Sequence, residues 1–131
     1  MPAGGLFSTA ADVARFCRML LNGGELDGKR VLSAKAVQTM TSNQVGELLN
    51  KGKGENGYGF GLQASRNLNG DQPGSGGAFG HGGAYATNMH IDPARGLIFV
   101  YMVQHAGYAN KEGKEISPAF EKAAAEKFGK Q

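Results

Sequence analysis

The sequence predicts an α+β fold, in which an antiparallel β-sheet is packed with helices. Apolar residues recur at helical spacing near both ends of the chain, and glycines alternate with large apolar residues over 57–62. Two extended segments, 89–91 and 97–105, flank a tight turn. With 131 residues the chain is long enough for one hydrophobic core. We therefore expect a single domain over 1–131, with the first and last helices covering the sheet.

The first helix is predicted to begin at Thr9 and to end at 22–24 (NGG). Thr9 followed three residues later by Asp12 is a capping-box signal, and a run of Asn and Gly commonly ends a helix. The apolar residues at helical spacing between them are Val13, Phe16, Cys17, Leu20 and Leu21. This spacing puts Cys17 on the buried face, where it acts as a small apolar side chain.

The middle of the chain is predicted to hold a second helix and a strand. Ser33 can cap a helix that runs through about Met40. The pattern is lost over 43–56, where we expect a mobile loop. Over 57–62 (GYGFGL) the period of two predicts a strand with one face of bare backbone. The large side chains on the other face are those of Tyr58, Phe60 and Leu62.

The last third of the chain combines a hairpin with a helix. Pro93 suits the second position of a type I turn, and Gly96 suits the left-handed residue that closes it. Ser117 is predicted to cap the last helix, with Pro118 in its first turn. The apolar residues expected to pack on the sheet are Phe120, Ala123, Ala124 and Phe128.

The charge and apolar patterns argue against a nucleic-acid or membrane partner. The net charge is +3, but lysines and glutamates alternate in the C-terminal tail, as they do on a solvated face. The longest apolar run, 97–103, is too short to cross a bilayer. The single cysteine excludes an intrachain disulfide, and no signal peptide is visible. A cytoplasmic location and export as part of a longer precursor both stay open.

A histidine set among glycines is the strongest candidate for a functional site. His81 lies within 79–85 (FGHGGAY), directly before the strand-like run 86–91. Its imidazole can carry a proton near neutral pH, and the glycines leave the main chain open to a ligand. We interpret this segment as one wall of an active site. The alternative is a plain turn with a structural histidine, because Gly-rich segments are commonly turns.

Four segments, in this order along the chain, resemble the serine beta-lactamase-like family. They are 2–12 (PAGGLFSTAAD), 20–24 (LLNGG), 57–61 (GYGFG) and 80–83 (GHGG) before a hairpin. That family includes penicillin-binding proteins, class C beta-lactamases, esterases and D-aminopeptidases. Its members carry three active-site elements: Ser-x-x-Lys, a Tyr-x-Asn or Ser-x-Asn loop, and a strand motif written Lys-Thr-Gly or His-x-Gly.

The resemblance maps residues 81–83 onto the third element and thereby implies roles for five residues. Ala84 would offer its backbone N–H to the oxyanion hole, and Gly82 and Gly83 would leave room for substrate along the strand. His81 would hold a substrate carboxylate or assist proton transfer. A histidine here favours esterase or peptidase chemistry over lactam hydrolysis. Tyr85 would lie near the pocket, with a buried structural tyrosine as the alternative interpretation.

The first two elements of the family are missing from their expected places. No serine of the chain is followed three residues later by lysine. The sequence Tyr-Ala-Asn at 108–110 spells the second motif but follows the histidine strand, where the family has it before, so we treat it as a chance match. The resemblance therefore implies a partial domain, the C-terminal part of a larger hydrolase. It would act on a small-molecule acyl substrate, without a cofactor, only when completed by the N-terminal portion.

Two other interpretations stay open beside the hydrolase. The first is a non-catalytic module whose glycine-lined groove beside His81 binds a peptide or acyl ligand by strand addition. The second is a metal site from three histidines. If the hairpin pairs Ile91 with Leu97, His105 shares a face with His81 while His90 points the other way. Two histidines without a third ligand make a weak site, so we expect no metal.

The resemblance also has a consequence for assembly. In the family, strands from the N-terminal part complete the sheet. A chain without them would leave a strand edge and apolar surface uncovered. We therefore expect self-association through the uncovered sheet edge.

Overall fold

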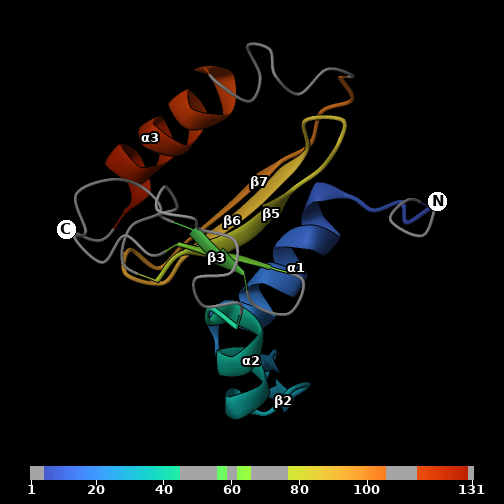
Figure 1. Ribbon diagram of the computed structural model, residues 1–131, viewed down its shortest axis with the longest axis vertical. Coiled ribbons are helices and arrows are strands. Elements are labelled where there is room, and N and C mark those ends of the chain that lie inside the picture. Colours follow the sequence, from blue (N-terminus) through green and yellow to red (C-terminus); the bar gives the residue numbers. More distant parts are fainter. Residues whose placement is uncertain (1–4, 45–55, 59–61, 66–76, 106–114, 130–131) are drawn as a thin grey trace.

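The computed structural model describes residues 5–44, 56–58, 62–65, 77–105 and 115–129. Within these ranges a five-stranded sheet lies between two helices, with α1 (Ala10–Leu21) on one face and α3 (Ser117–Phe128) on the other (Figure 1). A second helix, α2 (Ala34–Thr41), lies beyond the end of α1. The predicted α+β class, with the first and last helices covering an antiparallel sheet, is confirmed.

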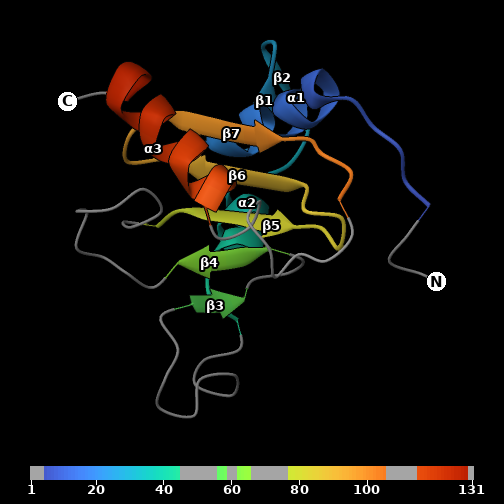
Figure 2. The ribbon, with the colours of Figure 1, turned by 90° about the horizontal axis from the view of Figure 1, so that it is seen from above.

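The strands of the sheet follow one another in space as they do in sequence (Figure 2). They are β3 (Asn56–Tyr58), β4 (Gln63–Ser65), β5 (Phe79–Gly82), β6 (Asn88–Asp92) and β7 (Leu97–Tyr101). Each neighbouring pair is antiparallel. Among the residues that the structure describes, β3 and β7 are therefore the two edges of the sheet.

The single strand predicted over 57–62 is wrong. Tyr58 is the register partner of Gln63 in the antiparallel pair of β3 and β4, so the chain reverses direction between them. Leu62 is buried, but it lies just before β4 and not in one strand with Tyr58. The alternation of glycine with apolar residues also suits a tight hairpin, because glycine adopts turn conformations easily. Phe60 and most of the loop expected over 43–56 lie outside the described residues.

The first two helices begin where the capping residues predict. The Thr9 hydroxyl accepts a hydrogen bond from the Asp12 amide at 3.1 Å, and the Ser33 hydroxyl accepts one from the Ala36 amide at 3.1 Å. These bonds satisfy amides that have no partner in the first turn of a helix. Between the two helices a short hairpin pairs β1 (Glu25–Leu26) with β2 (Lys29–Arg30).

The hydrophobic core lies between α1 and the sheet face that it covers. Phe79, Ile91 and Ile98 are in register across the three neighbouring strands β5, β6 and β7, so their side chains share this face. Ile91 is fully buried, and Cys17 of α1 is buried as predicted. The Cys17 Sγ lies 3.8 Å from the Met89 Sδ. The other fully or largely buried members of the cluster are Met19, Leu20, Val37 and Leu62.

The last helix docks differently from the prediction. Ser117 does not cap α3: the cap residue is Ile116, and Ser117 is buried, with its Oγ 3.4 Å from the Asn88 Nδ2. Phe128 and Ala123, expected to pack on the sheet, are exposed. Phe120 packs on Phe99 and Tyr101 of β7, as predicted for this residue. Ser117 and Glu121 face the polar residues of β6 instead, because Asn88 and His90 lie below this part of the helix.

The β6–β7 hairpin forms at the predicted turn but in a different register. Asp92 pairs with Leu97, and Ile91 pairs with Ile98, one residue further than expected. Asp92 is buried, and its carboxylate accepts a hydrogen bond from the Arg95 amide at 3.1 Å. This contact closes the turn and makes Asp92 the last residue of β6. Gly96 has φ of 66°, as the left-handed position requires.

None of the helices among the described residues is both long and apolar enough to cross a membrane. The Tyr-Ala-Asn sequence at 108–110 lies outside the described residues.

Candidate functional site

The segment that follows His81 forms a tight turn between β5 and β6. The Gly83 N–H donates to the Thr87 carbonyl at 2.7 Å, and the Ala86 N–H donates to the Gly83 carbonyl at 3.1 Å. Ala86 has φ of 67°, in the left-handed region. A type I turn followed by a left-handed residue is a common three-residue hairpin loop, although glycine is the usual residue at its last position. The turn therefore presents Ala84 and Tyr85 at its tip.

His81 and the tip of the turn are exposed at the same end of the sheet. His81 is the register partner of Met89, so it lies on the α1 face of β5. Its Nδ1 lies 2.6 Å from the Gly82 carbonyl oxygen. Ala84 is exposed, and Tyr85 is 55% exposed, so the interpretation of Tyr85 as a buried structural tyrosine is wrong. His81, Ala84 and Tyr85 are therefore each accessible from solvent.

The backbone amide of Ala84 is available for a ligand. The amides of Gly83 and Ala86 donate within the hairpin, whereas the Ala84 N–H donates no hydrogen bond within the part of the chain that the structure describes. An exposed amide at the tip of a rigid turn can donate to a carbonyl or an oxyanion without breaking the sheet.

Two glycines of this region are required by their neighbours in the fold. A Cβ added to Gly83 would lie 2.2 Å from the Thr87 Oγ1, and one added to Gly80 would lie 2.2 Å from the Met89 carbonyl oxygen. No real Cβ makes such contacts, so both positions need glycine for the close approach of β5 and β6. The resemblance implied that Gly83 leaves room for substrate along the strand. On the side of Gly83 where a Cβ would lie, the Thr87 hydroxyl fills the space.

The segment after β7 is fixed beside the turn. The His105 N–H donates to the Tyr85 carbonyl at 3.0 Å. The strand β7 ends at Tyr101, so His105 does not lie in the extended strand that was predicted over 97–105. His90 is the partner of Gly80 and faces the opposite side of the sheet from His81, as expected. Among the described residues, no group of three histidine, cysteine or acidic side chains could hold a metal ion.

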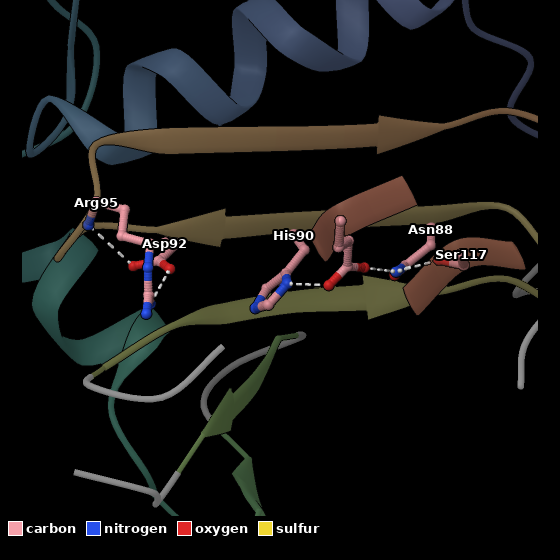
Figure 3. Close-up of polar contacts among 6 residues, drawn as sticks. Asn88, His90, Asp92, Arg95 and Ser117 are labelled. Atoms are coloured by element: carbon pink, nitrogen blue, oxygen red, sulfur yellow. Dashed lines mark hydrogen bonds and ion pairs between the residues drawn. The ribbon is translucent and has the colours of Figure 1, made fainter. Parts of the chain in front are cut away.

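A polar cluster under α3 was not anticipated from the sequence. Glu121 accepts hydrogen bonds from the Asn88 Nδ2 at 3.0 Å and from the His90 Nδ1 at 3.1 Å. The Asn88 Nδ2 also lies 3.4 Å from the Ser117 Oγ, and Figure 3 shows His90 and Asn88 along β6 with Ser117 of α3 beside Asn88. A carboxylate is only an acceptor, so the Nδ1 of His90 carries the proton in this contact.

The geometry of this cluster favours a structural role. Ser117 contacts Asn88, whereas His90 contacts Glu121, so no serine–histidine pair is formed. The His90 and Glu121 side chains are only 18% and 15% exposed. The signal in the sequence was the alternation of Asn88, His90 and Asp92 with apolar residues, which marks a polar second face of β6.

Comparisons with known proteins support the architecture. The family model described as Beta-lactamase matches residues 1–121. Two curated proteins of Mycobacterium tuberculosis are each 41% identical over 118 residues: Uncharacterized protein MT1414 of strain CDC 1551 / Oshkosh and Protein Rv1367c of strain ATCC 25618 / H37Rv. Each match covers 78% of this chain but only 28% of the relative, so the chain spans little more than a quarter of these proteins.

Two solved structures have the same fold over most of the chain. A Bacillus anthracis protein described as a 6-aminohexanoate-dimer hydrolase aligns with a TM-score of 0.69 and 28% identity, covering 91% of this chain and 29% of that protein. A beta-lactamase from Mycobacterium bovis aligns with a TM-score of 0.70 and 25% identity, covering 94% of this chain and 45% of that protein.

Proposed function

Because the chain belongs to the Beta-lactamase family, we propose that it forms the C-terminal portion of a serine hydrolase. The reaction would pass through an acyl-serine intermediate, with an ester, amide or lactam as substrate. The single observation that carries the proposal is the exposed turn after His81, where the Ala84 amide is free of hydrogen bonds within the described residues. Such a donor is what the tetrahedral intermediate of acyl transfer needs.

Each residue of the turn has a role in this proposal. The Ala84 N–H donates to the oxyanion as the substrate carbonyl becomes tetrahedral. His81, exposed at the end of β5, holds a substrate carboxylate or moves a proton to or from the reacting group. Gly82 lets the substrate lie close to the main chain, Gly83 lets Thr87 of the returning chain approach the turn, and Tyr85 forms the rim of the pocket. The left-handed Ala86 holds the tip in place.

The nucleophile has to come from polypeptide outside this sequence. No serine of the chain stands in a Ser-x-x-Lys motif, and acyl transfer needs the activated hydroxyl and the oxyanion donor in one pocket. The chain alone is therefore proposed to be inactive. The segment that completes it would carry Ser-x-x-Lys and then Tyr-x-Asn. A covered share of 28% to 45% in the relatives and solved neighbours is consistent with a partial domain.

The decisive test removes one backbone donor without disturbing the turn. The chain would be expressed together with the polypeptide encoded upstream in its reading frame, and hydrolysis of a p-nitrophenyl ester and of nitrocefin would be measured. Ala84→Pro deletes the N–H, and proline is favoured at the first central position of a type I turn. We expect kcat to fall by about 10²- to 10³-fold, the usual effect of losing one oxyanion donor.

The matched control is Ala84→Ser, which keeps the N–H and should change kcat by less than about threefold. Full activity of Ala84→Pro would remove Ala84 from the oxyanion hole. An upstream frame without Ser-x-x-Lys and Tyr-x-Asn would overturn the proposal that this is one portion of a hydrolase. Ligand binding that weakens on His81→Ala, without labelling of any serine by a fluorophosphonate probe, would favour the non-catalytic binding module instead.

A further inference from the structure

The tip of the turn after β5 is held by hydrogen bonds more than by burial. Ala84 is exposed and Tyr85 is 55% exposed, so side-chain packing contributes little to fixing them. The hydrogen bonds inside the hairpin close the base of the turn. One further bond comes from outside the hairpin, because the His105 N–H donates to the Tyr85 carbonyl at 3.0 Å. The chain that follows β7 therefore takes part in holding the tip.

The order of the strands brings this later segment to the turn. Both β5 and β7 pair antiparallel with β6, so they run in the same direction and finish at the same end of the sheet (Figure 2). Gly82, Asn88 and Tyr101 are in register at this end. The chain that leaves β7 therefore passes beside the turn, where the His105 amide contacts it.

The hydrogen bond from His105 is the first link of a continuous chain of peptide groups. The Tyr85 carbonyl belongs to the same peptide group as the Ala86 N–H, which donates to the Gly83 carbonyl at 3.1 Å. The Gly83 carbonyl in turn belongs to the same peptide group as the Ala84 N–H. A trans peptide group is planar, and its C=O and N–H point in opposite directions. The bonds therefore all run one way, from the His105 amide to the Ala84 amide.

We propose that this chain of hydrogen bonds aligns and polarises the Ala84 N–H, which makes His105 a positioning residue for the oxyanion donor. Hydrogen bonds in a chain polarise one another, with a strengthening of about 10–30% per bond. His105 acts here through its main chain and through the turn, and it touches neither the substrate nor the reacting atoms. The use of the chain in catalysis rests on the proposed function.

The first test removes the N–H at the start of the chain with His105→Pro. In the protein completed by the upstream polypeptide, kcat for the p-nitrophenyl ester should fall about two- to eightfold. This is about 10–30%, on a logarithmic scale, of the effect of losing the donor itself. KM should change by less than about twofold, because the oxyanion forms only in the transition state. The matched control, His105→Ala, keeps the N–H and should leave kcat within about 1.5-fold.

A second variant gives the same test without the fixed φ of proline. Lactic acid at position 105 places an ester oxygen where His105→Ala has an N–H, and the two proteins are otherwise identical. The ester should show the same loss of kcat relative to His105→Ala. In an Ala84→Pro background, His105→Pro should cause no further loss, because the donor through which it acts is already absent.

A readout that does not depend on activity is the NMR spectrum of this chain alone. In His105→Pro and in the ester, the amide protons of Ala86 and then of Ala84 should shift upfield, because each loses part of its polarisation. The Gly83 amide, which donates to Thr87 outside this chain of bonds, should keep its shift. These shifts test the hydrogen-bond chain even if the completed protein hydrolyses neither substrate, a result that would defeat the proposed function alone.

Three outcomes would overturn the proposal. A loss of kcat in His105→Ala equal to that in His105→Pro would assign the effect to the imidazole. Losses that add in the double variant with Ala84→Pro would make His105 a structural residue only. Unchanged amide shifts of Ala84 and Ala86 in both the proline and the ester variants would show that no polarisation passes along the turn.

Discussion

The two faces of the sheet are built with different chemistry, and β6 shows the difference residue by residue. Met89 and Ile91 point to the α1 face, where Ile91 is fully buried in the apolar cluster. Asn88, His90 and Asp92 point to the other face, where Asn88 and His90 bind Glu121 of α3. The α1 face is held by burial of apolar surface, whereas the α3 face combines directed polar contacts with the packing of Phe120 on Phe99 and Tyr101.

The difference shows what each face contributes. Burial of apolar area is roughly proportional to the area removed from water and has little directional preference, so the α1 face supplies most of the stability. Hydrogen bonds contribute less free energy but need defined partners, so the α3 face fixes where the helix docks. The Phe120 ring adds apolar contact there, yet it remains 42% exposed. Substitutions on each face test whether the two faces contribute to stability in these different ways.

The largest effect is expected from Ile91→Ala on the α1 face. Ile91 is fully buried, and removing its side chain leaves a cavity between the sheet and α1. We expect the free energy of unfolding to fall by about 2–5 kcal/mol in urea denaturation. The matched change on the other face, Phe120→Ala, should cost about 1 kcal/mol, because the ring is partly exposed. Equal losses would contradict the division between the faces.

A second effect on the α1 face depends on pH. Burial raises the pKa of the Cys17 thiol from 9.0 to about 11. As the pH rises from 9 towards 11, the unfolded chain loses this proton first, so stability is lost over that window and is fully present below it. A separation of about two pH units corresponds to a loss of about 2–3 kcal/mol. Urea denaturation at several pH values would measure it.

The control for the alkaline effect is Cys17→Ala. This variant has no thiol to ionise, whereas its lysines and tyrosines titrate as in the unmodified chain. Its free energy of unfolding should therefore fall less between pH 9 and 11. If the free energy of unfolding fell equally with pH in the two proteins, burial in the core would not be what keeps Cys17 protonated.

The α1 face was more predictable from sequence than the α3 face, because its signals are local. Thr9, Asp12 and the apolar stripe define α1 within one stretch of chain, and Pro93 with Gly96 defines the hairpin turn. The observed register of β6 and β7 differs by one residue from the predicted register, because the Asp92 carboxylate closes the turn. The spacing of apolar residues gave no sign that this carboxylate would be buried. Asp92 also makes an ion pair with the Arg95 guanidinium at 3.0 Å.

The packing of α3 was predicted only in part, with Phe120 on the sheet, because the rest depends on contacts between distant residues. An apolar face containing Phe128 was expected, but Glu121 and Ser117 dock on Asn88 and His90, about 30 residues earlier in the chain. By contrast, the candidate site could be proposed from one local motif, since its five residues are contiguous over 81–85. The solvent exposure of these residues could not be predicted from the sequence, because the exposure of Tyr85 depends on the geometry of the turn.

The polar contacts of the α3 face are tested by Glu121→Gln, with a smaller expected effect than that of Ile91→Ala. The carboxylate accepts from both Asn88 and His90, whereas an amide offers one acceptor and one donor group, so one of the two contacts is lost or must rearrange. We expect the free energy of unfolding to fall by about 1–2 kcal/mol, because the contact is charge-assisted and largely buried. Amide hydrogen exchange of 117–128 should accelerate more than that of 10–21.

The same carboxyl-to-amide change elsewhere on α3 separates docking from helix stability. Glu126 makes a 4.0 Å ion pair with Lys122, and both side chains are largely exposed. Glu126→Gln should therefore change the free energy of unfolding by less than about 0.5 kcal/mol. If Glu126→Gln lowers the free energy of unfolding as much as Glu121→Gln does, the loss comes from removing a negative charge from the helix. The contacts of Glu121 with Asn88 and His90 would then not be what fixes the position of α3. If only Glu121→Gln accelerates exchange in α3, directed hydrogen bonds hold this face where apolar burial holds the other.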